Sequence, residues 1–274
     1  MKPLRTISVL PTLFTLGNLV CGFFAIVVAS RIGRPESETV GIINPDDLRN
    51  VMISGWLIFV AMVFDGLDGH VARLARTSSD FGAQLDSLCD AVSFGIAPAF
   101  LLVKMCPRFA YLHREAVWII AASFAACAVL RLARFNVETS DEDDHLHFSG
   151  LPSPAAAGSI AGFAIIFYTL MDPETAPVYA DTIYAVLQRV LPFFALLVGL
   201  LMVSRIPYPH VTNQIFRGQR SFSHVVKLVF ALVAVMAIKG YAVPIVFCVF
   251  VLGSPIRFAW EKIVQRRHQE EPIF

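Results

Sequence analysis

The sequence predicts an all-α membrane protein, a polytopic helical bundle of about eight transmembrane helices. Three observations predict this class. Hydrophobic residues make up 56% of the chain, the mean hydropathy is +0.65, and only 16% of residues are charged, against roughly 25% in ordinary soluble domains. The net charge of +1 indicates no nucleic-acid partner.

Apolar runs of about 20 residues, the length that spans a bilayer, follow one another along the chain. They are Thr12–Ser30, Val51–Arg76, Gly82–Cys106, Ala116–Phe135, Pro154–Met171, Ile183–Val203, Val225–Ile238 and Ala242–Trp260. The first run continues to Ser30 without a small-x-small cleavage site near its end, so we expect a retained helix rather than a removed signal. The seventh run is short, and seven helices are an alternative.

Basic residues set the expected orientation. With eight helices, Lys and Arg are more numerous on the side that receives both termini and the even-numbered loops. The positive-inside rule places that side in the cytoplasm, and we expect a protein of the inner membrane. The five cysteines are widely spaced and form no Cys-x-x-Cys pair, so neither a disulfide framework nor a thiolate metal site is expected.

Four aspartates interrupt the second and third apolar runs. Ionised side chains in a spanning helix are costly and usually mark function. Asp65 and Asp68 share a helical arc of about 100° with Gly69, and Asp86 and Asp90 are one turn apart on the next helix. The short connection makes the two helices antiparallel, so all four carboxylates are expected at similar depth near the cytoplasmic side.

Four carboxylates cannot remain ionised together in a low-dielectric environment unless cations join them. Oxygen ligands alone favour a hard cation such as Mg²⁺, Mn²⁺ or Ca²⁺. Two ions bridging a phosphate would stabilise charge on its entering and leaving oxygens. The alternative is a set of protonated or Arg-paired carboxylates that hold helices together.

The pattern Asp65-Gly66-Leu67-Asp68-Gly69-x2-Ala72-Arg73-x8-Gly82-x3-Asp86-x3-Asp90 resembles the signature of the CDP-alcohol phosphotransferase family. The resemblance implies displacement of CMP from a CDP-alcohol by a second alcohol, with two Mg²⁺ or Mn²⁺ ions. It implies that Asp65, Asp68, Asp86 and Asp90 bind metal and that Asp90 is the catalytic base. The implied CDP-lipid-binding residues are Gly66, Gly69, Ala72, Arg73 and Gly82.

Three further stretches resemble the integral-membrane phosphatidylserine synthases of that family. They are Leu10–Gly22, Leu130–Asn136 and Gly150–Ala157, and Met202–Pro209 is a weaker fourth. This resemblance covers 1–210 as a catalytic domain, while 211–274 carries no recognised motif. Thr12 departs from the pattern, because many relatives have Asn there. The implied substrates are CDP-diacylglycerol and L-serine, and the implied assembly is a homodimer.

The position of two arginines fits a substrate with a carboxylate. Arg131 and Arg134 end the fourth apolar run on the side of the aspartates, and Arg can hold a carboxylate bidentately. Asn136 is a weaker candidate for the serine site. Asn18 is a candidate contact for the CDP-lipid, with an interhelical hydrogen bond as its alternative. Gly158-x3-Gly162 favours close helix packing or dimerisation.

Other functions remain open. Within the family, the acceptor could be glycerol 3-phosphate or inositol, as in phosphatidylglycerophosphate or phosphatidylinositol-type synthases. A divalent-cation transporter would also need intramembrane aspartates, but it would place acids through both leaflets. An intramembrane aspartyl protease would need two aspartates, and it leaves the glycines and Arg73 unexplained.

Overall fold

Long helices form nearly all of the computed structural model, which describes residues 9–33, 44–75, 80–138, 150–171, 176–208 and 241–269. The predicted all-α architecture is confirmed. In chain order the elements are α1 (Val9–Ser30), α2 (Pro45–Ala75), α3 (Asp80–Asp90), the π-helical η1 (Ala91–Ile96), α4 (Ala97–Met105), α5 (Pro107–Leu112), α6 (Arg114–Glu138), α7 (Ser153–Met171), α8 (Ala180–Val203) and α11 (Ala242–Gln269).

Seven helical stretches of the described part are long and apolar enough to cross a membrane. They are Pro11–Ser30, Pro45–Gly69, Phe81–Met105, Arg114–Val137, Ser153–Met171, Ala180–Val203 and Ala242–Lys262. The chain is therefore an integral membrane protein. The predicted span Val225–Ile238 lies outside the described residues. The third span runs without a break through α3, η1 and α4, as the single apolar run predicted.

Several helices extend beyond the apolar runs that predicted them. Helix α2 begins at Pro45, because the Asn44 side-chain oxygen caps the helix by accepting a 3.0 Å hydrogen bond from the Asp46 backbone N–H. Helix α11 continues past Trp260 to Gln269. There the Arg257 and Glu261 side chains, one turn apart, form a 2.8 Å ion pair.

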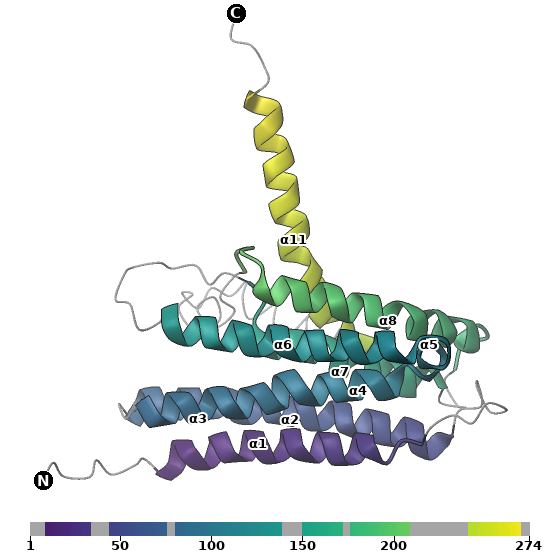
Figure 1. Ribbon diagram of the computed structural model, residues 1–274, viewed down its shortest axis with the longest axis horizontal. Coiled ribbons are helices and arrows are strands. Elements are labelled where there is room, and N and C mark those ends of the chain that lie inside the picture. Colours follow the sequence, from purple (N-terminus) through teal and green to yellow (C-terminus); the bar gives the residue numbers. More distant parts are fainter. Residues whose placement is uncertain are drawn as a thin grey trace, which may run out of the picture.

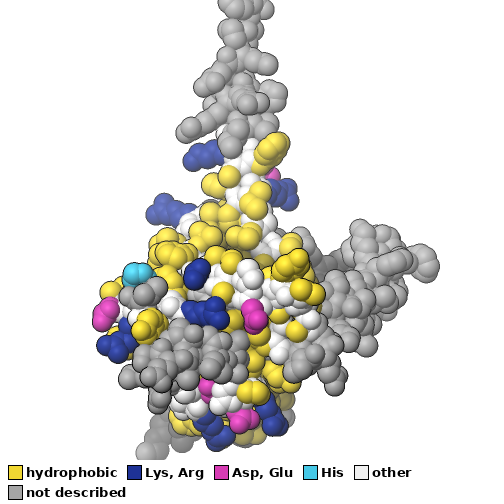
Figure 2. Space-filling view, turned by 90° about the vertical axis from the view of Figure 1, so that its right-hand side faces the viewer, with side chains coloured by type: hydrophobic (Ala, Val, Ile, Leu, Met, Phe, Trp, Pro, Cys, Tyr) yellow, Lys and Arg dark blue, Asp and Glu magenta, His cyan; other side chains and the backbone are white. Residues whose placement is uncertain are grey.

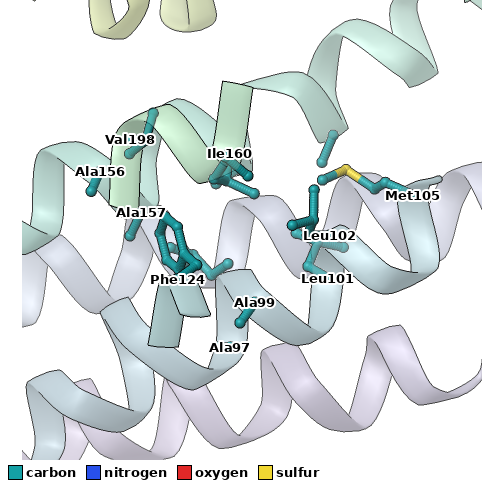
Figure 3. Packing of buried hydrophobic residues seen from close by; sticks show 14 of the residues in the cluster. Ala97, Ala99, Leu101, Leu102, Met105, Phe124, Ala156, Ala157, Ile160 and Val198 are labelled. Atoms are coloured by element: carbon teal, nitrogen blue, oxygen red, sulfur yellow. The ribbon is translucent and has the colours of Figure 1, made fainter. Parts of the chain in front are cut away.

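Apart from the short α5, the helices from α1 to α8 lie nearly side by side, as Figure 1 shows, with α1 and α2 on one side and α6 and α8 on the other. Helices α4 and α7 lie between them, and their small and aliphatic side chains fill the core. In Figure 3, α4 residues such as Leu102 face Ile160 and Ala157 of α7, and the ring of Phe124 of α6 packs beside Ala157. This packing fixes the relative positions of the helices that carry the aspartates.

Helix α11 projects from the bundle at a steep angle (Figure 1). Its first turns pack on the predicted glycine pair of α7: a Cβ on Gly162 would lie 2.8 Å from the Pro244 Cα, and one on Gly158 would overlap the Phe247 ring. The prediction of close packing is thus confirmed within one chain. The Tyr208 hydroxyl also donates a 2.9 Å hydrogen bond to the Val251 carbonyl.

Both ends of the bundle carry charged residues. The aspartates lie at the end that contains the start of α1, the end of α6 and the start of α7, which we call the aspartate end (Figure 1). Figure 2 views the molecule from the opposite end, where Lys, Arg, Asp and Glu side chains lie among hydrophobic ones. Charge on both ends with apolar helices between them is the arrangement expected of a membrane-spanning bundle.

Candidate metal and substrate site

Three aspartates from two helices converge at the aspartate end. Asp65 and Asp68 project from α2, and Asp86 projects from α3, which returns antiparallel to it. Each offers a carboxylate oxygen, and these oxygens all lie within 4.8 Å of one another. Asp68 is buried, and Asp65 and Asp86 are half-buried. The predicted meeting of the two aspartate pairs is therefore confirmed for these three residues, which we call the aspartate triad.

The triad fits a divalent cation. Asp68 Oδ2 and Asp86 Oδ1 are buried and have no hydrogen-bond partner in the described part of the chain. The Asp68 and Asp86 side chains also contact each other directly. Two carboxylates in contact require a proton or a cation between them, and oxygen ligands select a hard ion. The residues present thus have the chemistry of a divalent-cation site.

Asp90 lies beside the triad but is held separately. It is 7% exposed and lies within electrostatic range of Asp65, Asp68 and Asp86. Its Oδ1 accepts a 2.9 Å hydrogen bond from the Asn18 side-chain amide of α1. The interhelical bond that the sequence left as an alternative for Asn18 is therefore present. A CDP-lipid contact from the fully buried Asn18 stays an untested prediction.

Arg131 of α6 faces the same acidic site. Its Nη1 donates a 2.8 Å hydrogen bond to the Ser153 hydroxyl, its guanidinium lies 5.5 Å from the Phe135 ring centroid, and Asp65 and Asp90 are within electrostatic range. The segment before Ser153 is fixed by two backbone hydrogen bonds. The Gly150 N–H donates to the carbonyl of Ile206, just beyond α8, and the Leu151 N–H donates to the carbonyl of Leu201 in the last turn of α8. Gly150 has φ +97°, which favours glycine.

Asn136, five residues beyond Arg131, connects α6 to α3. Its side-chain amide donates a 2.9 Å hydrogen bond to the Ser87 hydroxyl, which in turn lies 3.2 Å from Asn136 Oδ1. Ser87 is the neighbour of Asp86, so this pair fixes α6 against α3, the helix that carries Asp86 and Asp90. Arg134 is half-buried on the same helix. Serine contacts from Arg134 and Asn136 remain predictions.

The family model for CDP-alcohol phosphatidyltransferase matches residues 8–204, a range that includes the four aspartates, Asn18 and Arg131. The chain belongs to the CDP-alcohol phosphatidyltransferase family. The resemblance stated from the aspartate pattern is thereby confirmed.

The chain is also similar to several proteins whose names refer to serine or to a serine lipid. The CDP-diacylglycerol–serine O-phosphatidyltransferase of Helicobacter pylori strain 26695 is 30% identical over 76% of this chain and 75% of its own length. The protein of that name from Methanocaldococcus jannaschii is 38% identical over 58% of this chain and 65% of its own. Archaetidylserine synthase of Methanothermobacter thermautotrophicus is 35% identical over 57% of each chain.

Two glycines of the family signature, Gly66 and Gly69, border open space. A Cβ on either would have no atom of the described residues within 4 Å, so packing within the described part of the chain does not require glycine at either position. Glycine inside a helix costs about 0.5–1 kcal/mol relative to alanine, and a ligand that approaches the helix backbone would explain it. Gly82 is half-exposed. Ala72 and Arg73 lie in α2, but their side chains are outside the described part.

Sequence reasoning missed four residues of this site. Thr15 of α1 approaches the Asp68 carboxylate, Ser87 binds Asn136, Ser93 binds the Asn18 carbonyl, and Ser153 binds Arg131. Thr15 and Ser153 carried a signal, because they belong to Leu10–Gly22 and Gly150–Ala157, two stretches that resemble the phosphatidylserine synthases. Ser87 and Ser93 are each a single hydroxyl within an apolar run and cannot be distinguished there from packing residues.

Proposed function

We propose that this protein transfers the phosphatidyl group of CDP-diacylglycerol to the hydroxyl of L-serine, giving phosphatidylserine and CMP. The observation that carries the proposal is the position of Arg131, a half-buried cation held by Ser153 beside Asp65 and Asp90. A guanidinium there can bind the serine carboxylate while the serine hydroxyl lies near Asp90. The names of the family relatives support the same acceptor.

Asp65, Asp68 and Asp86 are the residues that would hold divalent metal, with Asp90 as a further ligand. Two Mg²⁺ or Mn²⁺ ions would neutralise charge on the pyrophosphate and on the departing CMP. The open space at Gly66 and Gly69 leaves room for the nucleotide close to the α2 backbone. Ala72, Arg73 and Gly82 extend this proposed CDP-lipid site.

The transfer itself is a direct displacement. Asp90 accepts the proton of the serine hydroxyl as the oxygen attacks the phosphorus that carries diacylglycerol. A new P–O bond to serine forms while the P–O bond to CMP breaks, and CMP departs with that electron pair. Arg131 keeps the serine carboxylate in place during this exchange. Arg134 and Asn136 complete the proposed serine site.

We further propose that the aspartate end faces the cytoplasm and that the protein lies in the inner membrane. The excess of basic residues on that side supports this orientation. Serine and CMP would then exchange with the cytoplasm, while the lipid chains stay in the bilayer. A homodimer is a separate proposal, and the mass of the protein in lipid nanodiscs would test it.

The decisive experiment uses the purified protein in nanodiscs with CDP-diacylglycerol and one acceptor at a time: L-serine, glycerol 3-phosphate or inositol. We expect CMP release with serine and a lipid product that carries the serine headgroup. The Asp86→Asn variant, prepared in parallel, measures contaminating activity. CMP release with another acceptor but not with serine would overturn the proposal. A parallel arm with an ether-linked CDP-lipid tests the donor, because one relative is named archaetidylserine synthase.

A further inference from the structure

Asn18 of α1 is held at two points by the helix that carries Asp90. Its side-chain Nδ2 donates a 2.9 Å hydrogen bond to Asp90 Oδ1. Its backbone carbonyl accepts a 3.0 Å hydrogen bond from the Ser93 hydroxyl of η1. Asn18 and Ser93 are fully buried. The two bonds lock one residue of α1 against Asp90 and the turn that follows it.

The backbones of α1 and η1 are in direct contact at this point. Gly22, one turn beyond Asn18, packs on Ser93, and a Cβ on Gly22 would lie 2.7 Å from the Ser93 Cα. Ser93 belongs to the π-helical turn Ala91–Ile96, which begins immediately after Asp90. Single π-helical turns are rare and frequent at functional sites. The chain therefore departs from regular helix where it brings Ser93 onto Asn18.

Stability alone does not explain an asparagine here. Asn18 Oδ1 is buried and has no hydrogen-bond partner in the described residues. An unsatisfied buried acceptor costs about 1–3 kcal/mol, whereas leucine has the same branching and number of side-chain heavy atoms and carries no polar atom that would need a partner. An amide with one unpaired polar atom in an apolar interior lowers the stability of the fold locally. Such local losses of stability are typical of functional sites. The satisfied half of the amide is the half that binds Asp90.

We infer that Asn18 is a positioning residue that acts through Asp90, with Ser93 fixing Asn18 in turn. Asn18 holds Asp90 Oδ1, so that Oδ2 is presented to the serine hydroxyl. The inference rests on the proposed function, in which Asp90 is the base. It assigns Asn18 no contact with either substrate. A misplacement of about 1 Å at a reacting group can cost about 100-fold in rate, so one hydrogen bond suffices for this role.

The test is a double-mutant cycle between Asn18→Leu and Asp90→Asn, measured by CMP release. Asn18→Leu alone should lower kcat about 10- to 100-fold, the effect of one hydrogen bond to a charged group. The KM values for both substrates should stay within about twofold. In the Asp90→Asn background, Asn18→Leu should add little further loss, because residues that act as a unit are non-additive. Ser93→Ala should lower kcat in the same direction, by less.

Ser54→Ala is the matched control. The Ser54 hydroxyl is also buried and donates a 2.9 Å hydrogen bond to an α1 carbonyl, that of Ala25, two turns beyond Asn18. It should lower the thermal midpoint about as much as Ser93→Ala while leaving kcat unchanged. Binding of CDP-diacylglycerol, followed by thermal shift, should be retained in Asn18→Leu.

Each other outcome overturns the inference in a distinguishable way. A raised KM for CDP-diacylglycerol in Asn18→Leu would make Asn18 a substrate contact instead. Additive losses in the cycle would show that Asn18 does not act through Asp90. Equal kcat losses in Ser93→Ala and Ser54→Ala would reduce the role to helix packing. Full activity in Asp90→Asn would refute the base assignment in the proposed function itself.

Discussion

Arg131 of α6 donates a 2.8 Å hydrogen bond to the hydroxyl of Ser153, the first residue of α7, and its guanidinium also lies within electrostatic range of Asp65 and Asp90. A buried cation needs an anionic partner, and the hydroxyl of Ser153 is neutral. The acidic site and an incoming carboxylate are the charges that this guanidinium can balance. Of the two arginines that the sequence offered, Arg131 is thus the better candidate for the substrate carboxylate.

Arg131→Ala should raise the KM for serine by about one to two orders of magnitude, the range for a charge-assisted hydrogen bond. The KM for CDP-diacylglycerol should change little. Arg131→Lys should rescue poorly, because a point charge cannot replace a bidentate fork. Arg134→Ala on the same helix is the control and should have the smaller effect. The reverse ranking in acceptor titrations would assign the carboxylate to Arg134.

Loss of any member of the aspartate triad should weaken metal binding at the site. Asp65→Asn, Asp68→Asn and Asp86→Asn keep the side-chain shape but remove a charged ligand, and each should reduce Mn²⁺ affinity measured by electron paramagnetic resonance. CMP release should fall in parallel. Excess chelator should stop the wild-type reaction, and added Mg²⁺ or Mn²⁺ should restore it. Full turnover in a chelated preparation would exclude a metal role for the triad.

Asp90→Asn should separate catalysis from binding. A general base contributes about 10²–10⁴-fold, so CMP release should fall by that factor while the variant still binds CDP-diacylglycerol. Asparagine keeps the volume of the side chain, and the fold should be retained. A simultaneous loss of Mn²⁺ and CDP-lipid binding would identify Asp90 chiefly as a ligand.

The spacing of the aspartates was enough to predict the triad, because helical periodicity and a short connection between antiparallel helices leave little freedom in their arrangement. The hydrogen bond from Asn18 to Asp90 joins residues 72 positions apart. It depends on how α1 docks, and no local pattern encodes that. The same holds for Ser87 with Asn136 and for Ser153 with Arg131.

The start of α2 and the end of α11 lie beyond the apolar runs that predicted these helices. The early start of α2 had a local signal, since Asn44-Pro45 is a capping residue followed by a favoured first helical residue. The predicted apolar run does not include the first turn of α2, because Asp46, Asp47 and Arg49 make this turn polar. The continuation of α11 past Trp260 was missed for the same reason, as charged residues follow there.

Gly69→Ala tests whether the open space beside the triad is a ligand site. Alanine favours a helix over glycine by about 1 kcal/mol, and a Cβ at Gly69 meets no atom of the described residues within 4 Å. The thermal midpoint should therefore stay the same or rise. If the nucleotide approaches the α2 backbone here, the added methyl group should raise the KM for CDP-diacylglycerol about tenfold, or about 1.4 kcal/mol. The KM for serine should be little affected.

Gly253→Ala supplies the control for this prediction. Gly253 lies within α11, and among the residues that the structure describes a Cβ there also meets no atom within 4 Å. The substitution makes the same gain in helix propensity without approaching the triad, so both KM values should stay at the wild-type level. If Gly69→Ala and Gly253→Ala give the same kinetics, the space beside Gly69 is not occupied by the CDP-lipid. If Gly69→Ala lowers the thermal midpoint instead, the glycine serves packing rather than ligand access.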